Sequence, residues 1–384
     1  MDRRVALLGS TGSIGRQTID VIDNTSGLCI TAIAASSNIE MAEAQIRKYG
    51  IGLAAMFDEN AARELRRRTA DLEVEVLSGI DGVCEIAARD NSDIVLSAVG
   101  GMVGIRPALA ALDAKKPLAL ANKESLVAAG DIVMECSRRN NVAVLPVDSE
   151  HSAIFQCLRG GREKEIKKVV LTASGGPFYG LSREVLEGVS PQDALRHPNW
   201  SMGPKITIDS ASLMNKGLEF IECMHLFGLS ADKIDIVIHR ESIVHSMVMF
   251  CDNSVIAQLS PPDMRLPIQY ALCYPVREGA VIEQLDLCAV GKLTFGPPDL
   301  DVFGCLRLAI AAANAGGSMP AVLNGANEEA VSLFLGGGIK FTDIEKLVEK
   351  ACSAHNIIKN PELDGIMDAD RWSREYIKRA AAAL

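Results

Sequence analysis

Residues 9–15 read Gly9-Ser10-Thr11-Gly12-Ser13-Ile14-Gly15 and join two segments of different character. The preceding residues 5–8 form a short apolar run typical of a buried strand, and residues 16–22 have the spacing of an amphipathic helix. Glycines in such a strand–turn–helix unit allow a sharp bend and let backbone N–H groups approach a pyrophosphate at the positive end of the helix. A tight turn without a ligand would use the same glycines, so the run favours dinucleotide binding without establishing it.

Outward from this turn, residues 1–147 alternate short apolar runs with amphipathic stretches. The apolar runs lie at residues 5–8, 30–34, 94–98, 118–120 and 142–147. This alternation is typical of a parallel sheet covered by helices. The sequence therefore predicts an α/β fold that begins with a Rossmann-like, dinucleotide-binding domain over residues 1–147.

The pattern changes after residue 147 and predicts two more domains. Strand-like runs at 169–171, 236–239, 246–250 and 255–259 lie among loops that contain Gly and Pro, which predicts a central α+β catalytic domain over residues 148–273. Residues 274–300 contain Gly296-Pro297-Pro298 and are interpreted as a linker. Helical spacing at 305–315, 320–335 and 342–353 predicts a C-terminal helical bundle over residues 301–384.

Composition narrows the class of protein. The chain has 384 residues, 48% of them hydrophobic, and a formal net charge of -10, which argues against nucleic acid as a partner. Ten cysteines without a C-x-x-C pair indicate a reducing compartment rather than a zinc or redox centre. The first apolar run is too short for a signal peptide, and no run approaches the roughly 20 residues that span a bilayer. We expect a cytoplasmic protein with no membrane partner.

The loop after the second predicted strand bears on which dinucleotide binds. It reads Ala35-Ser36-Ser37-Asn38, where an NAD enzyme usually places an acidic residue for the ribose 2′-hydroxyl. Hydroxyl and amide groups can meet a 2′-phosphate that a carboxylate would repel, so NADP is preferred over NAD. A polar turn with no ligand contact is the alternative.

A metal site is suggested by Asp148-Ser149-Glu150-His151, which follows the strand at 142–147. If this stretch is extended, Asp148 and Glu150 point to the same side and can share a cation. Open α/β sheets place ligands beyond the carboxyl ends of their strands, which favours a site over a solvated surface pair. Glu219 can supply a third carboxylate, and an all-oxygen set selects a hard ion such as Mg²⁺ or Mn²⁺.

Phosphate capture in an acidic protein needs a few well-placed donors. Ser174-Gly175-Gly176 can form a backbone nest, and Ser210, Asn215 and Lys216 offer a hydroxyl, an amide and an ammonium. Asn215 and Lys216 could equally be a helix cap followed by a solvated lysine. The loop at 197–203, with Trp200 and Met202, can pack on the protein or close over a substrate as a lid.

With these segments identified, the sequence resembles the 1-deoxy-D-xylulose 5-phosphate reductoisomerases. The matching runs are GSTGSIG at 9–15, LANKESLV at 120–127, PVDSEHSAIFQ at 146–156, LTASGGPF at 171–178, HPNWSMGPKITIDSASLMNKGLE at 197–219, PPDMRLPI at 261–268 and LNGANE at 323–328. They occur in the order of the family and span nearly the whole chain. Two runs depart from what many members of the family carry: Ser36-Ser37 stands in place of a Gly-Lys or Gly-Arg pair, and His239-Arg240-Glu241-Ser242 in place of His-Pro-Gln-Ser.

The resemblance implies an NADPH- and metal-dependent enzyme that converts 1-deoxy-D-xylulose 5-phosphate to 2-C-methyl-D-erythritol 4-phosphate, an isoprenoid precursor, with Mg²⁺, Mn²⁺ or Co²⁺. It implies metal ligands and catalytic residues at Asp148, Glu150 and Glu219, with Lys123 also catalytic. Implied substrate contacts are Lys123, Ser149, Glu150, Ser174, His197, Ser210, Asn215, Lys216 and Glu219. Implied NADPH contacts are Thr11, Gly12, Ser13, Ile14, Ser36, Ser37, Asn38, Asn122, Glu124 and Gly203.

The family resemblance further implies a homodimer that forms through the 148–273 domain. It predicts a weaker preference for NADP than usual, because Ser36-Ser37 offers no cation to the 2′-phosphate. It predicts altered packing rather than altered chemistry at Arg240. The alternatives are a metal-bound sugar-phosphate dehydrogenase that leaves the carbon skeleton unchanged, and a dinucleotide-sensing protein without turnover.

Overall fold

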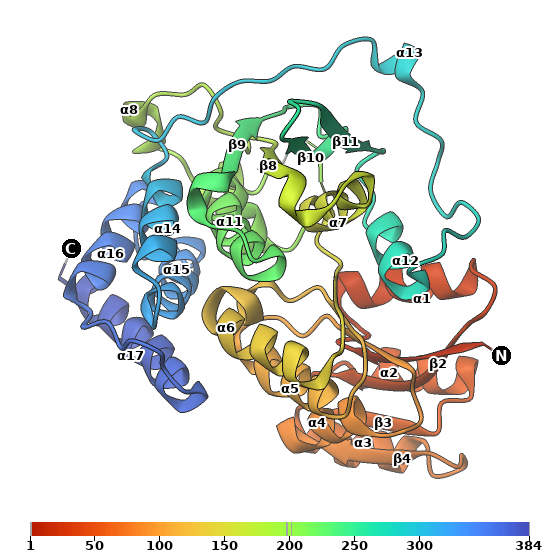
Figure 1. Ribbon diagram of the computed structural model, residues 1–384. Coiled ribbons are helices and arrows are strands. Elements are labelled where there is room, and N and C mark those ends of the chain that lie inside the picture. Colours follow the sequence, from red (N-terminus) through yellow and green to blue (C-terminus); the bar gives the residue numbers. More distant parts are fainter. Residues whose placement is uncertain (1, 197–198, 201, 384) are drawn as a thin grey trace. The chain divides into compact units, whose positions relative to one another are not determined.

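The computed structural model describes residues 2–196, 199–200 and 202–383 (Figure 1). Contacts within the chain divide it into two compact units. The first unit runs as far as Ser125 and includes Val133–Ser152 and Asp263–Glu283. The second unit comprises Leu126–Ile132, Ala153–Pro262 and the chain from Gln284 onward. Each unit is described by itself below.

A seven-stranded sheet with all of its strand pairs parallel forms the centre of the first unit (Figure 1). Its strands are β1 (Arg3–Leu8), β2 (Leu28–Ala35), β3 (Leu53–Met56), β4 (Glu75–Ser78), β5 (Ile94–Ser97), β6 (Leu118–Leu120) and β7 (Val144–Pro146). Their order is β4-β3-β2-β1-β5-β6-β7, so the direction of winding reverses between β1 and β5. The predicted Rossmann-like sheet is confirmed, although β3 and β4 were not among the predicted strands. Loops at this reversal are where such sheets bind ligands.

Helices connect and cover these strands. They are α1 (Ser13–Asp23), α2 (Ile39–Tyr49), α3 (Glu59–Arg68), α4 (Gly79–Ala88), α5 (Ile105–Asp113), α6 (Lys123–Asn140) and α12 (Arg265–Cys273), with a 3-10 turn η1 (Met102–Gly104) before α5. Helix α12 comes from a distant part of the sequence and packs beside α1. There the Gln269 amide donates to Thr25 Oγ1 at 3.0 Å. The first unit therefore contains residues that the sequence alone would assign to the central domain.

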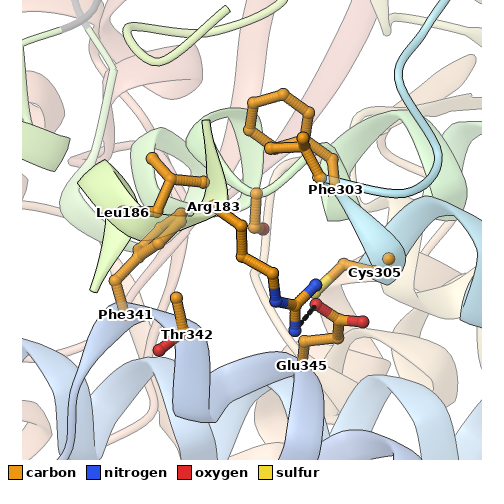
Figure 2. Close-up of a pocket in the computed structure, with 10 residues that line it drawn as sticks. Arg183, Leu186, Phe303, Cys305, Phe341, Thr342 and Glu345 are labelled. Carbon is orange, nitrogen blue, oxygen red and sulfur yellow. Dashed lines mark ion pairs between the residues drawn. The ribbon is translucent and has the colours of Figure 1, made fainter. Parts of the chain in front are cut away.

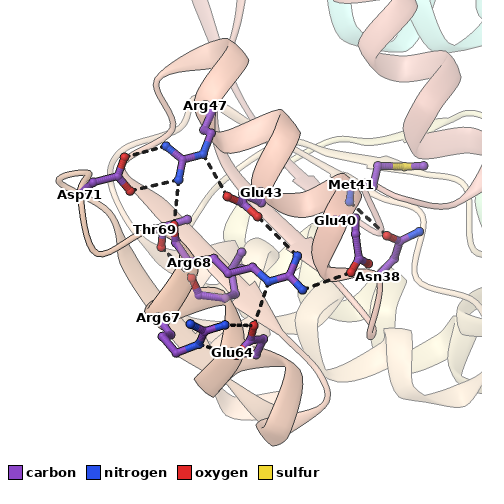
Figure 3. Close-up of polar contacts among 11 residues, drawn as sticks. Asn38, Glu40, Met41, Glu43, Arg47, Glu64, Arg67, Arg68, Thr69 and Asp71 are labelled. Atoms are coloured by element: carbon purple, nitrogen blue, oxygen red, sulfur yellow. Dashed lines mark hydrogen bonds and ion pairs between the residues drawn. The ribbon is translucent and has the colours of Figure 1, made fainter.

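Helices α2 and α3 are joined by a surface network of charges, shown in Figure 3. Arg68 of α3 contacts Glu40 of α2 at 3.3 Å and Glu64 at 2.9 Å, and Arg47 of α2 contacts Asp71, just after α3, at 2.8 Å. Hydrogen bonds from Arg67 and Arg68 lower the pKa of the Glu64 carboxyl to about 2. Exposed pairs of this kind are screened by solvent and add little stability, so the buried strands rather than these ion pairs hold the unit together.

The second unit begins with a four-stranded mixed sheet. Its strands are β8 (Ile166–Ala173), β9 (Ile234–Ile238), β10 (Val244–Phe250) and β11 (Val255–Leu259), in the order β11-β10-β8-β9. Its larger helices are α10 (Pro204–Ala211), α11 (Met214–Phe227) and the part of α7 (Ser149–Cys157) from Ala153 onward, and its short ones are α8 (Arg183–Leu186), α9 (Pro191–Ala194) and α13 (Leu287–Val290). Val169, Leu171 and Val248 of the sheet form one buried cluster with Phe220 and Cys223 of α11. The predicted α+β region is confirmed.

Four helices complete the second unit (Figure 1). They are α14 (Gly304–Ala315), α15 (Met319–Leu335), α16 (Phe341–Ala354) and α17 (Leu363–Ala381), and the sequence analysis named all but the last. Their apolar faces share a core with α10 and α11, in which the Phe334 and Phe341 rings lie 5.6 Å apart. The predicted helical bundle is confirmed. No helix in the described part of the chain has the length and apolar character needed to cross a membrane.

Close helix packing in this core predicts an unequal response to glycine replacement. A Cβ atom added at Gly217 on α11 would lie 2.3 Å from Ala309 Cβ on α14, whereas one at Gly365 on α17 meets only Pro361 Cβ at 3.6 Å. Overpacking should make Gly217→Ala destabilising by about 1–3 kcal/mol. Gly365→Ala should stabilise by up to about 1 kcal/mol, because alanine favours a helix. Urea unfolding of both variants checks this, and equal effects would contradict the packing argument.

Candidate active site

The glycine turn after β1 has the geometry of an anion-binding helix start. Gly9 has a φ of +87°, and an added Cβ would lie 2.5 Å from Ala98 O in the loop after β5. An added Cβ at Gly15 would lie 2.2 Å from Gly9 O, so α1 can approach the strand only with glycine there. Gly12 is the N-cap of α1, no side chain caps the helix, and its first turn holds no acidic residue. The positive end of α1 therefore fits a pyrophosphate.

Loops at the same edge of the sheet carry other residues expected to contact the dinucleotide. Ser36 and Ser37 are exposed after β2, and the Asn38 side chain accepts from Met41 N at 3.1 Å as the N-cap of α2 (Figure 3). Asn122 is the N-cap of α6 and donates to Val99 O at 2.6 Å. Asn38 and Asn122 thus have structural roles that the sequence analysis did not assign. Glu124, whose Oε2 accepts from Asn122 Nδ2 at 3.1 Å, lies in the first turn of α6.

The first unit holds Lys123 against Asp148. Lys123 Nζ lies 3.0 Å from Asp148 Oδ2, and both side chains are nearly buried, with 9% and 13% exposed. Asp148 directly precedes α7, and its Oδ1 accepts from Glu150 N at 3.2 Å. The prediction of an extended stretch from Asp148 to Glu150 is wrong, because Ser149 and Glu150 form the first turn of a helix. Ser149 Oγ donates to Glu150 Oε2 in this turn.

His151 is a residue that the sequence analysis left without a role. Its ring is fully buried, and its Nδ1 lies 3.1 Å from Asp148 Oδ1. A histidine and a lysine thus contact the two oxygens of one carboxylate, which restricts how that carboxylate can turn. The signal in the sequence was the position of His151 one helical turn after Asp148.

In the second unit, the first turns of α11 gather an amide, an ammonium and a carboxylate. Asn215 Nδ2 donates to Glu219 Oε1 at 2.5 Å, and Lys216 Nζ donates to Glu219 Oε2. Glu219 is 1% exposed and Lys216 is 3% exposed. The alternative of a helix cap followed by a solvated lysine is therefore wrong. A charged pair buried in this way is costly to desolvate and needs hydrogen bonds on both partners, which is typical of a site rather than of a surface.

The loop at Ser174-Gly175-Gly176 lies against the helix that carries Ser210. Gly175 and Gly176 have φ values of +78° and +66°, and Gly176 N donates to Ser174 Oγ at 3.3 Å. A Cβ at Gly176 would lie 2.6 Å from Ser210 O, so only glycine allows this approach. Two of the residues expected to bind phosphate are thus brought close together within one unit.

The segment expected to form a lid is described in part. His197, an expected substrate contact, lies outside the described residues. The Trp200 ring lies 6.2 Å from the ring of His245 on β10, and Met202 is partly buried. Burial lowers the pKa of the His245 imidazole to about 4, so Trp200 meets a neutral ring near neutral pH. Gly203 follows as the N-cap of α10.

A buried polar network below this segment was missed by the sequence analysis. Asp209 on α10 is 1% exposed, accepts from Asn327 Nδ2 of α15 at 2.7 Å, and contacts Lys205 Nζ at 3.0 Å. The bond to Asn327 anchors α10 to the C-terminal helices at the residue directly before Ser210. The available signal was the polar run LNGANE at 323–328, which matched the family but carried no assigned residue.

A cavity near the starts of α8, α14 and α16 is a different feature (Figure 2). It has a volume of about 20 Å³, and its wall includes the ion pair of Arg183 and Glu345 at 2.9 Å. Thr342 Oγ1 is buried there without a partner among the described residues. A space of this size has room for about one water molecule and is far too small for a sugar phosphate.

Three family models match consecutive parts of the chain. The model for 1-deoxy-D-xylulose 5-phosphate reductoisomerase matches residues 5–130, and that for its C-terminal domain matches residues 144–227. A further DXP reductoisomerase C-terminal domain model matches residues 259–376. Together they cover both units.

Curated relatives and solved structures similar to this chain belong to the same family as the matching models. The 1-deoxy-D-xylulose 5-phosphate reductoisomerase of Heliobacterium modesticaldum is 52% identical over 98% of this chain and 97% of its own length. The enzyme of Exiguobacterium sibiricum is 50% identical over 99% of this chain and 100% of its own length. The Zymomonas mobilis enzyme in complex with NADPH has a TM-score of 0.94 at 37% identity and covers all of both chains. A DOX-P reductoisomerase with NADPH, fosmidomycin and magnesium has a TM-score of 0.94 at 38% identity, covering 99% of this chain and 98% of the other. The chain therefore belongs to the 1-deoxy-D-xylulose 5-phosphate reductoisomerase family.

Proposed function

We propose that this chain converts 1-deoxy-D-xylulose 5-phosphate to 2-C-methyl-D-erythritol 4-phosphate, using NADPH and a divalent metal ion. The observation that carries the proposal is identity of about half of all residues to curated reductoisomerases over nearly the whole chain. The structure supports it with a dinucleotide turn in the first unit and a buried acid–lysine pair in each unit. When bound, the metal supplies Lewis acidity to substrate oxygens and NADPH supplies the hydride.

The proposed metal ligands are Asp148, Glu150 and Glu219. All three offer carboxylate oxygens, which suits Mg²⁺, Mn²⁺ or Co²⁺ with positions left for water or substrate. Relatives of known structure contain magnesium. Lys123 keeps the Asp148 carboxylate oriented, and Lys216 does the same for Glu219. These carboxylates are thus held in fixed positions before any ion binds.

The substrate would be held by its phosphate and by its reacting oxygens. We assign the phosphate to Ser174, Ser210, Asn215 and Lys216, and the family resemblance adds His197 as a substrate contact. Ser149, Glu150 and Glu219 contact the sugar. Lys123 donates a hydrogen bond to the oxygen on which negative charge develops, and it can pass a proton to it. Holding both ends of the sugar keeps its carbon atoms in place while the skeleton rearranges, and the loop with Trp200 and Met202 excludes water.

NADPH would lie across the carboxyl ends of β1, β2 and β5. Backbone N–H groups at Thr11, Gly12, Ser13 and Ile14 would hold the pyrophosphate, and Ser36, Ser37 and Asn38 would hold the ribose phosphate. Asn122, Glu124 and Gly203 complete the expected contacts. The Zymomonas mobilis relative was solved with this dinucleotide.

We also propose that the protein is a cytoplasmic homodimer. Strand β11 lies at the edge of its sheet, and Val255 and Ile256 on it are 47% and 37% exposed. An exposed apolar edge strand is a common site of association between chains. Sedimentation velocity at micromolar concentration checks this, because a monomer mass would contradict it.

The function is tested by following reduced nicotinamide absorbance with the keto-sugar phosphate and purified protein. Oxidation of NADPH should require added Mn²⁺ or Mg²⁺ and should stop in chelator, because the carboxylates alone cannot polarise the substrate. The product should have a branched carbon skeleton by NMR. An unbranched product, or turnover in chelator, would identify a simple dehydrogenase instead.

Glu219→Gln tests the metal assignment. Glutamine keeps the shape of the side chain but removes the anionic ligand, and its single oxygen can accept from only one of Asn215 and Lys216. Turnover should fall by at least about a hundredfold, and more metal should be needed for half-activation. NADPH binding, measured by its fluorescence, should be unchanged. Full activity in this variant would remove Glu219 from the ligand set.

Lys216→Gln tests the phosphate assignment. The amide can still donate to Glu219, but the positive charge is lost, so the KM for the keto-sugar phosphate should rise about tenfold or more. The metal requirement should change less than in Glu219→Gln. A KM equal to that of the wild type would exclude Lys216 from phosphate binding.

A further inference from the structure

The turn between β9 and β10, residues 239–243, is held firmly by its own side chains. His239 is fully buried, its Nδ1 lies 2.8 Å from Thr294 O, and its Nε2 accepts from Ile243 N at 3.2 Å. Because Nε2 is an acceptor, the ring donates through Nδ1. Glu241 accepts from Thr294 Oγ1 at 2.6 Å. Residues on both sides of Arg240 are therefore fixed.

Arg240 reaches from this turn to the loop at 174–176. Its Nη1 donates to Ser174 O at 2.8 Å and to Gly176 O at 2.6 Å. Its guanidinium carbon lies 5.5 Å from the centre of the Tyr179 ring, within range of a cation–π contact. One side chain thus ties together both ends of the loop.

The two glycines make the loop at 174–176 flexible unless other contacts hold it in place. Gly175 and Gly176 both have positive φ values, and glycine loses more conformational freedom on ordering than any other residue. The loop also lies against Ser210, where Gly176 has no room for a side chain. Movement of the loop would therefore change the position of Ser174 relative to Ser210.

We propose that Arg240 is a positioning residue for phosphate binding, and that its charge also strengthens the hold on a phosphate dianion. The inference rests on the proposed function, which places the phosphate at Ser174 and Ser210. The guanidinium behind the loop places a positive charge near the proposed phosphate position, in a chain whose net charge of -10 repels an anionic substrate. The family residue suggested for this position, proline, has neither a side-chain donor nor a charge.

The same turn also contacts the segment expected to form the lid. Asn199 Nδ2 donates to Arg240 O at 2.6 Å and to Ser242 Oγ at 2.8 Å. The Arg240 acceptor is a main-chain carbonyl, which a substitution of the side chain leaves in place. A substitution at Arg240 therefore removes the guanidinium while the hydrogen bond from Asn199 to the main-chain carbonyl stays in place.

The test compares Arg240→Met, which removes the charge and the donors, with Arg240→Gln, which keeps an amide donor without the charge. Arg162→Met is the matched control, because Arg162 is exposed in the same unit and its loss changes the net charge equally. Inorganic phosphate is the probe, measured as a competitive inhibitor against the keto-sugar phosphate. The substrate KM and the phosphate inhibition constant should rise about tenfold in Arg240→Met and less in Arg240→Gln. We expect kcat and the KM for NADPH to stay close to wild type, and Arg162→Met to match the wild type throughout.

Unchanged phosphate inhibition in both Arg240 variants would overturn the inference. So would a loss of kcat and Tm without a selective rise in KM, since that describes a structural role alone. If Arg240→Met does not fold, the phosphate inhibition constant of Arg240→Gln decides. Failure of the proposed function is distinguishable, because the wild type would then neither turn over the keto-sugar phosphate nor respond to phosphate.

Discussion

The ion pair between Lys123 and Asp148 is the constraint on which the proposed chemistry depends. Its two side chains are nearly buried and 3.0 Å apart, so each charge is stabilised by the other in a poorly solvated setting. Lys123 begins α6 and Asp148 precedes α7, and the parallel strands β6 and β7 bring these two helix starts to one edge of the sheet. The sheet therefore places Lys123, at the start of α6, next to Asp148, which directly precedes α7.

The second unit also contains a buried lysine–carboxylate pair, with both residues on a single helix. Lys216 and Glu219 are one turn apart on α11, so their pairing follows from helical spacing, and the packing of α11 on β8 and α14 buries them. In both units a carboxylate proposed as a metal ligand is already bonded to a lysine. Such pairs fix a ligand in place and lower the reorganisation needed when an ion arrives.

Glycine sets the close approaches around these charges. Gly9 and Gly15 let α1 begin near β1, and Gly176 lets the loop after β8 touch the Ser210 backbone. Hydrogen bonds from residues far away in the sequence then fix the segments around Ser174 and Ser210. Arg240 bonds to the Ser174–Gly176 loop, and Asn327 bonds to Asp209 beside Ser210. The C-terminal helices thus have a specific contact with the helix that carries Ser210, beyond general support.

Local patterns in the sequence determined the strand–turn–helix at 9–15, most of the strands and helices, and the residue types expected at the site, because periodicity and glycine spacing act over a few neighbours. They did not reveal β3, β4 or α17, nor the helical turn at Ser149 and Glu150, where context outweighed local preference. Only the tertiary structure decided that Lys216 is buried against Glu219, that His151 contacts Asp148, and that Arg240 ties the 174–176 loop. Burial and contacts between distant residues depend on how whole elements pack, and no short stretch of sequence encodes that packing.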